Sequence, residues 1–412
     1  MQRLNAKLCI FALVLALTAT GILTIYSSSA VVAASRVNRV RSRQLRLGET
    51  FRPVNHHSLY LRKQIVWCAL GLTALMFFYA SDYNKVLHRS KWLLLLSLIL
   101  LGAVYIPNLG LQINGARRWI RLGPMTFQPS ELAKLALVIV TAKMLNDRRE
   151  QLYSFARGLL PPLLLVTPIV AIIAVEDLGT AIVIALIVGT LWFIAGIRLR
   201  HLLALAPAGL AALALGVLVE PYRRERVINF VKAILDREDL KELLSSSWQP
   251  QQALIAVGTG GWSGLGLGAG IQKHHFVAAM YTDFAFANLC EELGFIRVVA
   301  LLGLFAALFI IGFRVAYKSP DFVGALLAAG MTTMIAVPVL INVAVVLRCL
   351  PAKGLALPFI SYGGSSLLIN MSAVGLLMNI ARRNEQTQQA RRPVAVTPER
   401  RLWRWGRTGE AY

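Results

Sequence analysis

Apolar residues in this chain gather in long runs rather than in the alternation of a strand or the one-sided stripe of a surface helix. A helix that crosses a bilayer needs about 20 mostly apolar residues, because its backbone must satisfy its own hydrogen bonds in lipid. The pattern predicts ten such helices, at roughly residues 8–30, 64–81, 92–108, 130–146, 158–175, 179–197, 201–219, 288–314, 321–347 and 365–381. We therefore expect an all-α polytopic membrane protein with a large outer loop, residues 220–284, between the seventh and eighth helices.

The composition agrees with this pattern and excludes a soluble fold. Hydrophobic residues make up 57% of the 412 residues and charged residues only 15%, against about 25% charged residues in soluble proteins. The net charge is nevertheless +23, so the basic residues must gather in loops and tails. The four cysteines lie in or beside apolar runs without Cys-x-x-Cys spacing, which favours packing over a metal site or a disulfide framework.

An even number of spans places both termini on one side of the membrane. Short inner loops carry more Lys and Arg than short outer loops when both termini are cytoplasmic, as the positive-inside rule requires. The first run also resembles a cleaved signal peptide, but its length and the nine runs that follow favour an uncleaved helix. We expect residues 1–381 to form the membrane domain and residues 382–412 to form a disordered, basic cytoplasmic tail.

Charged residues at the outer boundary are candidates for chemistry. Glu131 and Lys134 lie one turn apart at the start of the fourth span, so they can pair structurally or line a polar cavity. Arg117 and Arg118 precede them, and interfacial guanidinium groups attract phosphate or lipid headgroups. Asp177, before the sixth span, can cap that helix or serve a function.

The long outer loop is basic at its start and rich in glycine near its end. Arg223 and Arg226 form a cationic cluster where the chain leaves the membrane, and an amphipathic stretch follows at Asp236–Leu244. The run Gly258–Gly268 either lets backbone N–H groups approach a phosphate or serves only as a turn. The other long outer segment, residues 35–63, is also rich in Arg and carries no motif that explains it.

Asp283 lies at the outer end of the eighth span. A carboxylate beside apolar residues can have a raised pKa and can take a proton from a hydroxyl group, although a helix cap fits the position equally well. The last outer segment, Pro351–Ser366, contains two prolines and three glycines. Such a non-helical segment is tolerated at membrane depth only where it is buried in protein or lines a cavity.

Taken in order, these motifs resemble the SEDS family (shape, elongation, division and sporulation), the membrane peptidoglycan glycosyltransferases. The resemblance covers about residues 8–381 and is closer to the FtsW-like division branch than to the RodA-like branch. The strings that carry it are Asn114–Ile120, Gln128–Glu131, Asp177–Thr180, Glu220–Arg226, Gly258–Lys273, Thr282–Phe284, Glu291–Gly294 and Pro351–Ser366.

The resemblance implies polymerisation of lipid II at the outer face of the bacterial cytoplasmic membrane. Asp283 matches the family's catalytic aspartate and would act as general base in a displacement that inverts the anomeric carbon. Substrate contacts are expected from Arg118, Glu131, Lys134, Arg223, Arg226, Gln252, Lys273, Lys353, Ser361 and Tyr362. A divalent cation, Mg²⁺ or Mn²⁺, is a candidate cofactor with no assigned ligands. The expected partners are a class B penicillin-binding protein (a transpeptidase) and other division proteins, with no nucleic acid.

The chain departs from the family pattern at several positions. Val277–Thr282 replaces the usual Leu-Pro-Glu-x-His-Thr before Asp283, Glu176 replaces a proline, and Arg348 stands where glycine is common. These changes alter the surroundings of the aspartate but keep its carboxylate. Two other hypotheses stay open. One is a lipid II transporter lined by Glu131, Lys134 and Asp177, and the other is a non-catalytic scaffold for division proteins.

Overall fold

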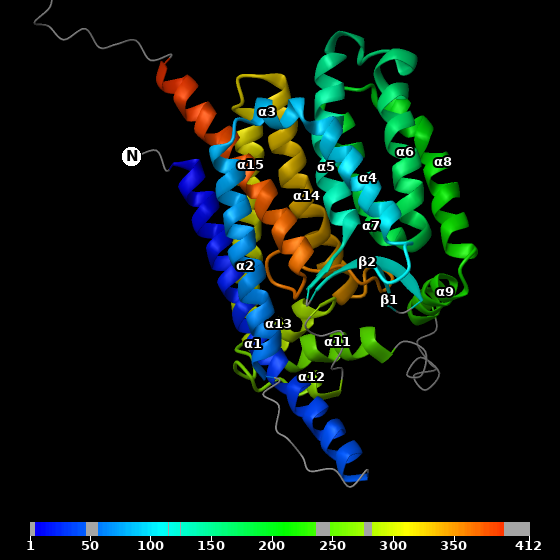
Figure 1. Ribbon diagram of the computed structural model, residues 1–412, viewed down its shortest axis with the longest axis vertical. Helices are drawn as coiled ribbons and strands as arrows, with labels where there is room; N and C mark the ends of the chain where they lie inside the picture. The colour runs from blue at the N-terminus through cyan, green and yellow to red at the C-terminus, as the bar shows by residue number, and fades with distance from the viewer. Residues whose placement is uncertain are drawn as a thin grey trace, which may run out of the picture.

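The computed structural model describes residues 5–46, 57–113, 115–123, 125–235, 248–275 and 282–390. Each apolar run predicted from the sequence coincides with a helix there, which confirms the all-α polytopic fold. The long helices are α1 (Ala6–Arg46), α2 (His57–Ala80), α4 (Ser90–Ala103), α5 (Pro129–Asp147), α6 (Leu160–Glu176), α7 (Leu178–Ile194), α8 (Leu199–Leu218), α13 (Ala285–Tyr317), α14 (Phe322–Val346) and α15 (Gly364–Ala390). They stand side by side as a bundle (Figure 1).

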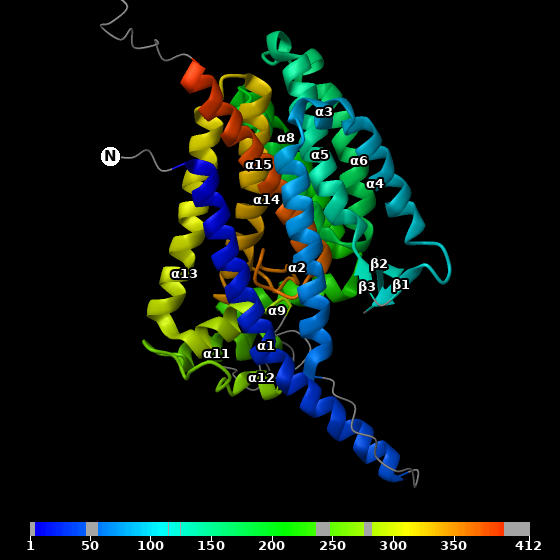
Figure 2. The same ribbon diagram turned by 60° about the vertical axis from the view of Figure 1, so that its left-hand side comes forward.

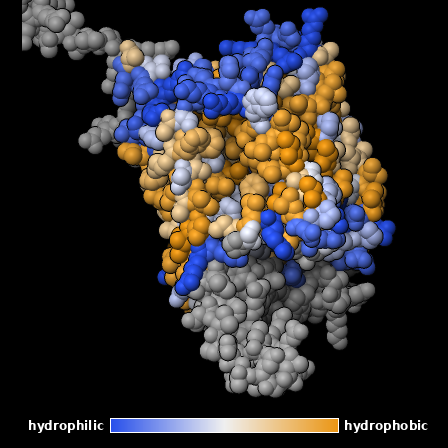
Figure 3. All heavy atoms as spheres, viewed as in Figure 1, coloured by the Kyte–Doolittle hydropathy of each residue, from blue (hydrophilic) through white to orange (hydrophobic). Residues whose placement is uncertain are grey.

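Seven helices in the described part of the chain are long and apolar enough to cross a membrane. Of the other three, α4 and α7 are shorter apolar helices, and α5 carries Glu131 and Lys134 near its start. Ten crossings therefore remain a prediction. An apolar band runs across the middle of one face of the molecule, with hydrophilic residues above and below it (Figure 3), as expected of a protein seated in a bilayer.

The centre of the bundle is formed by α5, α14 and α15, whose side chains are largely buried. By contrast, α8 has no buried residue and lies at the edge, where an apolar helix needs lipid around it. Short elements join the helices on the side of the N-terminus. They are α3 (Tyr83–His88), a 3₁₀ turn (Arg149–Gln151) and a π turn (Phe155–Leu159).

A small antiparallel sheet that the sequence pattern did not predict lies between α4 and α5. Its strands are β1 (Gly110–Ile113), β2 (Ala116–Leu122) and β3 (Met125–Phe127), in the order β1-β2-β3. Leu111 pairs with Trp119 and Ile120 pairs with Phe127. The sheet lies at the end of the bundle opposite the N-terminus (Figure 2), and β2 carries Arg117 and Arg118.

The described parts of the long loop, residues 220–235, 248–275 and 282–284, contain three helices, α9 (Pro221–Leu235), α11 (Trp248–Thr259) and α12 (Gln272–His275). The amphipathic stretch predicted at Asp236–Leu244 lies outside the described residues, as do residues 277–281 of the altered segment before Asp283. The N-terminus and the end of α15 lie at one end of the bundle, and α9, α11 and the sheet lie at the other (Figure 1).

The glycine-rich run packs against a break in α13. Gly294 has a left-handed φ of 76°, so the helix is interrupted there. The freed backbone groups exchange hydrogen bonds with the run: Leu265 N–H donates to Glu291 O (3.0 Å), and Phe295 N–H donates to Gly261 O (2.9 Å). A Cβ on Gly294 would lie 2.1 Å from the Gly264 nitrogen. These contacts give the glycines a structural reason, and the amide of Leu265 is already used within the protein.

The predicted boundary between membrane domain and tail, after residue 381, is too early. Helix α15 continues to Ala390, and its polar end is held in place: Asn384 donates to Val315 O (2.9 Å) and Glu385 pairs with Lys7 (3.1 Å). The apolar signal stops before the helix does, because Arg, Gln and Glu are themselves good helix formers. The rest of the predicted tail, residues 391–412, lies outside the described residues.

Candidate functional site

Asp283 lies in a turn directly before α13, against the last outer segment. Its main-chain oxygen accepts a hydrogen bond from the side chain of Asn342 (2.9 Å), a buried residue of α14 that also donates to Leu355 O (2.6 Å). A Cβ on Gly354 would stand 2.5 Å from Oδ2 of Asp283, so the carboxylate lies directly against that glycine. The backbone of α14 and the outer segment together fix the position of this carboxyl group.

Burial raises the pKa of the half-buried Asp283 carboxyl. Arg226, a hydrogen bond with Thr282, and Arg118 all lower it, and the negative charge of Asp177 raises it further. The net pKa lies above the ordinary value for aspartate. A carboxylate in this state is a stronger base than a solvated one, which suits it to accept a proton from a hydroxyl group.

Asp177 is the centre of a second group of polar residues beside the first. It accepts hydrogen bonds from the main-chain N–H (3.1 Å) and hydroxyl (2.8 Å) of Thr180, so it caps α7 as the sequence allowed. Its carboxylate also lies 3.2 Å from Lys353 Nζ and 3.7 Å from Arg118 Nη1. Asp177 thus serves as a helix cap and as the anchor of two cations.

The charges of this group depend on one another. Burial tends to raise the pKa of Asp177, but Lys353, Arg118 and Thr180 outweigh it, and the pKa lies below its ordinary value. Burial lowers the pKa of Lys353, an effect that Asp177 opposes. Space for this pair depends on Gly179, because a Cβ there would lie 1.6 Å from Cε of Lys353.

Two of the three arginines of α9, Arg223 and Arg226, bind different parts of the protein. Arg223 donates to the main-chain oxygens of Val175 (2.6 Å) and Gly216 (3.1 Å), so it joins the outer ends of α6 and α8. Arg226 donates to Ala352 O (3.0 Å) and contacts Tyr222 through its hydroxyl and ring. Of these two, Arg226 is the one whose charge lowers the pKa of Asp283.

Several predicted substrate-binding residues make contacts within the protein. Glu131 and Lys134 pair with each other at 2.8 Å inside α5. Lys273 is buried and pairs with Glu292 (2.9 Å) and Ser27 (3.1 Å). Ser361 accepts a hydrogen bond from Leu357 N–H (2.8 Å) within its own turn. The structure brings four predicted site residues together around Asp177: Asp283, Arg118, Arg226 and Lys353. Gln252 lies half-buried in α11, and Tyr362 lies half-buried beside Ser361.

Three residues of the site were missed by sequence reasoning. Gly179 leaves room for the side chain of Lys353, and Gly354 leaves room for that of Asp283. No local sequence pattern distinguishes such a glycine from an ordinary one. Asn342 carried a usable signal, since a polar side chain inside an otherwise apolar span is costly and needs a reason. A group of three or more His, Cys, Asp or Glu side chains able to hold a metal ion does not occur among the described residues.

The fold and site define a polytopic membrane protein with a charged, partly enclosed site at the ends of its helices opposite the start of α1. Residues 7–386 match the FtsW/RodA/SpoVE family, described as cell cycle proteins. The chain is 36% identical over 382 residues to stage V sporulation protein E of Bacillus subtilis (strain 168), covering 92% of this chain and 98% of that one. It is 37% identical over 383 residues to the probable peptidoglycan glycosyltransferase FtsW of Saccharophagus degradans, covering 92% of each.

Solved structures of proteins with this fold show the same similarity. A chain of a peptidoglycan synthase complex, studied for the coordination of polymerization and crosslinking, superposes with a TM-score of 0.70 at 31% identity, covering 92% of this chain and 98% of that one. The rod shape determining protein RodA of Thermus thermophilus gives a TM-score of 0.62 at 30% identity, covering 91% and 96%. The chain belongs to the FtsW/RodA/SpoVE family, which confirms the resemblance drawn from its motifs.

Proposed function

We propose that this protein is a peptidoglycan glycosyltransferase that polymerises lipid II at the outer face of the bacterial cytoplasmic membrane, with Asp283 as general base. The relatives named as probable peptidoglycan glycosyltransferases and the likeness to a peptidoglycan synthase complex support the activity. The single observation that carries the assignment of the base is the carboxyl of Asp283, half-buried with a raised pKa and within the electrostatic influence of Arg226 and Arg118.

Two groups change charge during the transfer: the base, which takes up a proton, and the pyrophosphate, which leaves with an electron pair. The 4-hydroxyl of the acceptor sugar attacks the anomeric carbon of the donor, and its proton passes to the carboxylate of Asp283. The bond from that carbon to the pyrophosphate breaks, and the leaving oxygen keeps the electron pair. Arg226, Arg118 and Lys353 are the cations placed to stabilise this leaving group. One displacement by one base inverts the anomeric carbon.

A divalent cation, Mg²⁺ or Mn²⁺, fits this site only in part. Such an ion commonly takes one or two protein carboxylates and completes its shell with phosphate oxygens and water. Asp177 is already paired with Lys353 and Arg118, which leaves Asp283 as the carboxylate available to it. A bound cation would add electrostatic stabilisation of the leaving pyrophosphate.

We further propose a role in cell division together with a class B penicillin-binding protein and other division proteins. The FtsW names of several relatives support the division role, and the matched synthase complex supports a partnership between polymerisation and crosslinking. Both termini would face the cytoplasm, because the short loops at their end of the bundle carry the excess of Lys and Arg.

The experiment that tests the function separates polymerisation from transport. The purified protein, with its transpeptidase partner and Mg²⁺, is incubated with labelled lipid II, and glycan chains are resolved by gel. We expect long chains from the wild type and none from Asp283→Ala. Movement of lipid II across liposomes without chain formation would instead identify a transporter. The absence of both activities, with the partner still bound, would identify a scaffold.

A further inference from the structure

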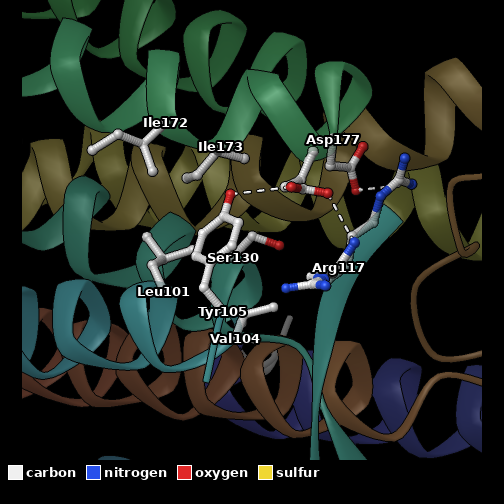
Figure 4. A pocket seen from close by; sticks show the side chains of 10 residues that line it. Leu101, Val104, Tyr105, Arg117, Ser130, Ile172, Ile173 and Asp177 are labelled. Carbon is white, nitrogen blue, oxygen red and sulfur yellow. Dashed lines mark hydrogen bonds and ion pairs between the residues drawn. The ribbon is translucent and has the colours of Figure 1, made fainter. Parts of the chain in front are cut away.

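A pocket next to the Asp177 group shares Arg118 with the chemistry proposed above, but its other walls have no role in it. It lies between the ends of α4 and α6, the start of α5 and strand β2, and its cavity volume is about 30 Å³ (Figure 4). One ordered water needs about 10–15 Å³ on this measure. The enclosed space therefore takes only a small group such as the oxygens of one phosphate, and the rest of a larger ligand must lie outside it.

One end of the pocket carries positive charge that the protein does not fully pair. Arg117 and Arg118 both line it. In the described part of the chain, Arg117 uses its main-chain N–H but its guanidinium has no hydrogen bond or ion pair. The Nε of Arg118 is buried without a hydrogen-bond partner, and its Nη1 lies 3.7 Å from Asp177, beyond hydrogen-bond distance.

The two acidic residues at this end are already satisfied. Glu176 accepts hydrogen bonds from Arg117 N–H (2.8 Å) and from the hydroxyl of Tyr105 (3.1 Å), and Asp177 is held by Thr180 and Lys353. Counting Lys353, three cations face two carboxylates, which leaves one positive charge. An anionic group with donors arranged around it would satisfy both the spare charge and the buried Nε of Arg118.

The other walls of the pocket are aliphatic. Leu101 and Val104 come from α4, and Ile172 and Ile173 come from α6. Half of the Ile172 side chain is exposed, so the apolar side of the pocket is open at the surface of the bundle. Both helices pack against α5. At the end of an apolar span, lipid chains meet the polar head groups.

We propose that this pocket binds the phosphate end of a membrane lipid, with Arg117 and Arg118 on the phosphate and the first part of the chain between α4 and α6. A polyprenyl phosphate, as in the substrate, and a phospholipid share this chemistry. The inference rests on the proposed function only where it favours the polyprenyl phosphate over the phospholipid. Placement of a substrate's lipid phosphate here would bring its head group beside Asp177, and so beside Asp283.

Binding of lipid without turnover tests the proposal. The purified full-length protein in detergent is titrated with undecaprenyl monophosphate, which lacks a sugar to transfer, and separately with phosphatidylglycerol, and bound lipid is measured by native mass spectrometry. We expect Arg117→Ala to weaken binding about tenfold or more, and Ile172→Trp, which fills the apolar wall, to do the same. Arg121→Ala removes an equal charge from the same strand at a position that does not line the pocket, and should change binding less than about twofold.

Each outcome decides a separate question. Tighter binding of the polyprenyl phosphate assigns the pocket to the substrate, and equal, variant-sensitive binding of both lipids assigns it to head groups in general. Binding that neither Arg117→Ala nor Ile172→Trp affects overturns the pocket, even if lipid II is polymerised normally. Arg117→Lys, with its thermal melting curve, serves if the alanine variant does not fold. If lipid binding depends on Arg117 but the protein does not polymerise lipid II, the proposed function is wrong and the proposed lipid pocket still stands.

Discussion

The carboxylate of Asp283 lies so close to Gly354 that a Cβ at that position would stand 2.5 Å from Oδ2 and 3.0 Å from Cγ. The backbone φ of Gly354 is not in the left-handed region, so alanine is compatible with the backbone there. The glycine is therefore required for space around the carboxylate rather than for backbone conformation.

Substitution Gly354→Ala should displace the carboxylate and reduce lipid II polymerisation by about tenfold or more, because small displacements of a base are costly. The thermal midpoint should change little, since the aspartate can move toward solvent. Gly363→Ala is the matched control, because its Cβ would meet atoms at 3.6 Å and 3.7 Å, an ordinary contact. Equal activity in the two variants would show that the close approach to Asp283 has no role.

The ion pair between Asp177 and Lys353 should depend on Gly179. Gly179→Ala pushes the lysine away, and we expect a loss of about 1–3 kcal/mol in the free energy of unfolding together with reduced polymerisation. Gly189→Ala lies in the same helix with open space around it, so it should be neutral or stabilising by up to about 1 kcal/mol. Chemical denaturation of both variants in detergent makes the comparison, and equal losses would contradict the role of Lys353.

The pH dependence of polymerisation should report the surroundings of Asp283. A general base must be deprotonated, so the rate falls as the pH drops through its raised pKa. Arg226 lowers this pKa, so Arg226→Gln should raise the pKa and move the acid limb of the rate profile to higher pH. Arg224→Gln, an exposed neighbour in α9, should leave the limb in place. A shift of the limb to lower pH in Arg226→Gln would contradict the assignment.

Arg348 is strained by its position at the end of α14. It has a φ of 57°, and the N–H groups of Arg348 and Cys349 donate to Val345 O (3.1 Å) and Ala344 O (2.7 Å), the Schellman pattern that normally has glycine at this position. Arg348→Gly should stabilise the protein by about 0.5–1 kcal/mol. Arg348→Ala keeps the backbone strain and should not. Chemical denaturation measures the free energy of unfolding of both variants. A similar increase in both would show that the arginine side chain, and not the backbone conformation, destabilises the protein.

Much of this molecule follows from its sequence, for reasons that differ between its parts. The helices were predictable because a span must be apolar throughout, and the family followed from the order of specific strings such as Pro358–Ser366. The three-stranded sheet was not predicted, because its strands are only three to seven residues long and the pattern around Arg117 is charged.

The candidate site was predictable only as residue types. Lys273 and Arg226 look alike in sequence as outer-loop cations, yet Lys273 is buried against Glu292 whereas Arg226 acts on Asp283. Likewise the glycine-rich run resembled a ligand loop, and its amides bond to the broken helix at Gly294. These distinctions depend on contacts between segments far apart in the chain, which local patterns do not encode.

The rate of lipid II polymerisation by Asp283→Asn tests the central claim most directly. Asparagine keeps the shape of the side chain and removes its ability to accept a proton at neutral pH. We predict that the rate at saturating lipid II falls by about 10²–10⁴, with binding of lipid II unchanged. A rate within about twofold of the wild type, in the same preparation and with the same partner, would contradict the assignment of Asp283 as the general base.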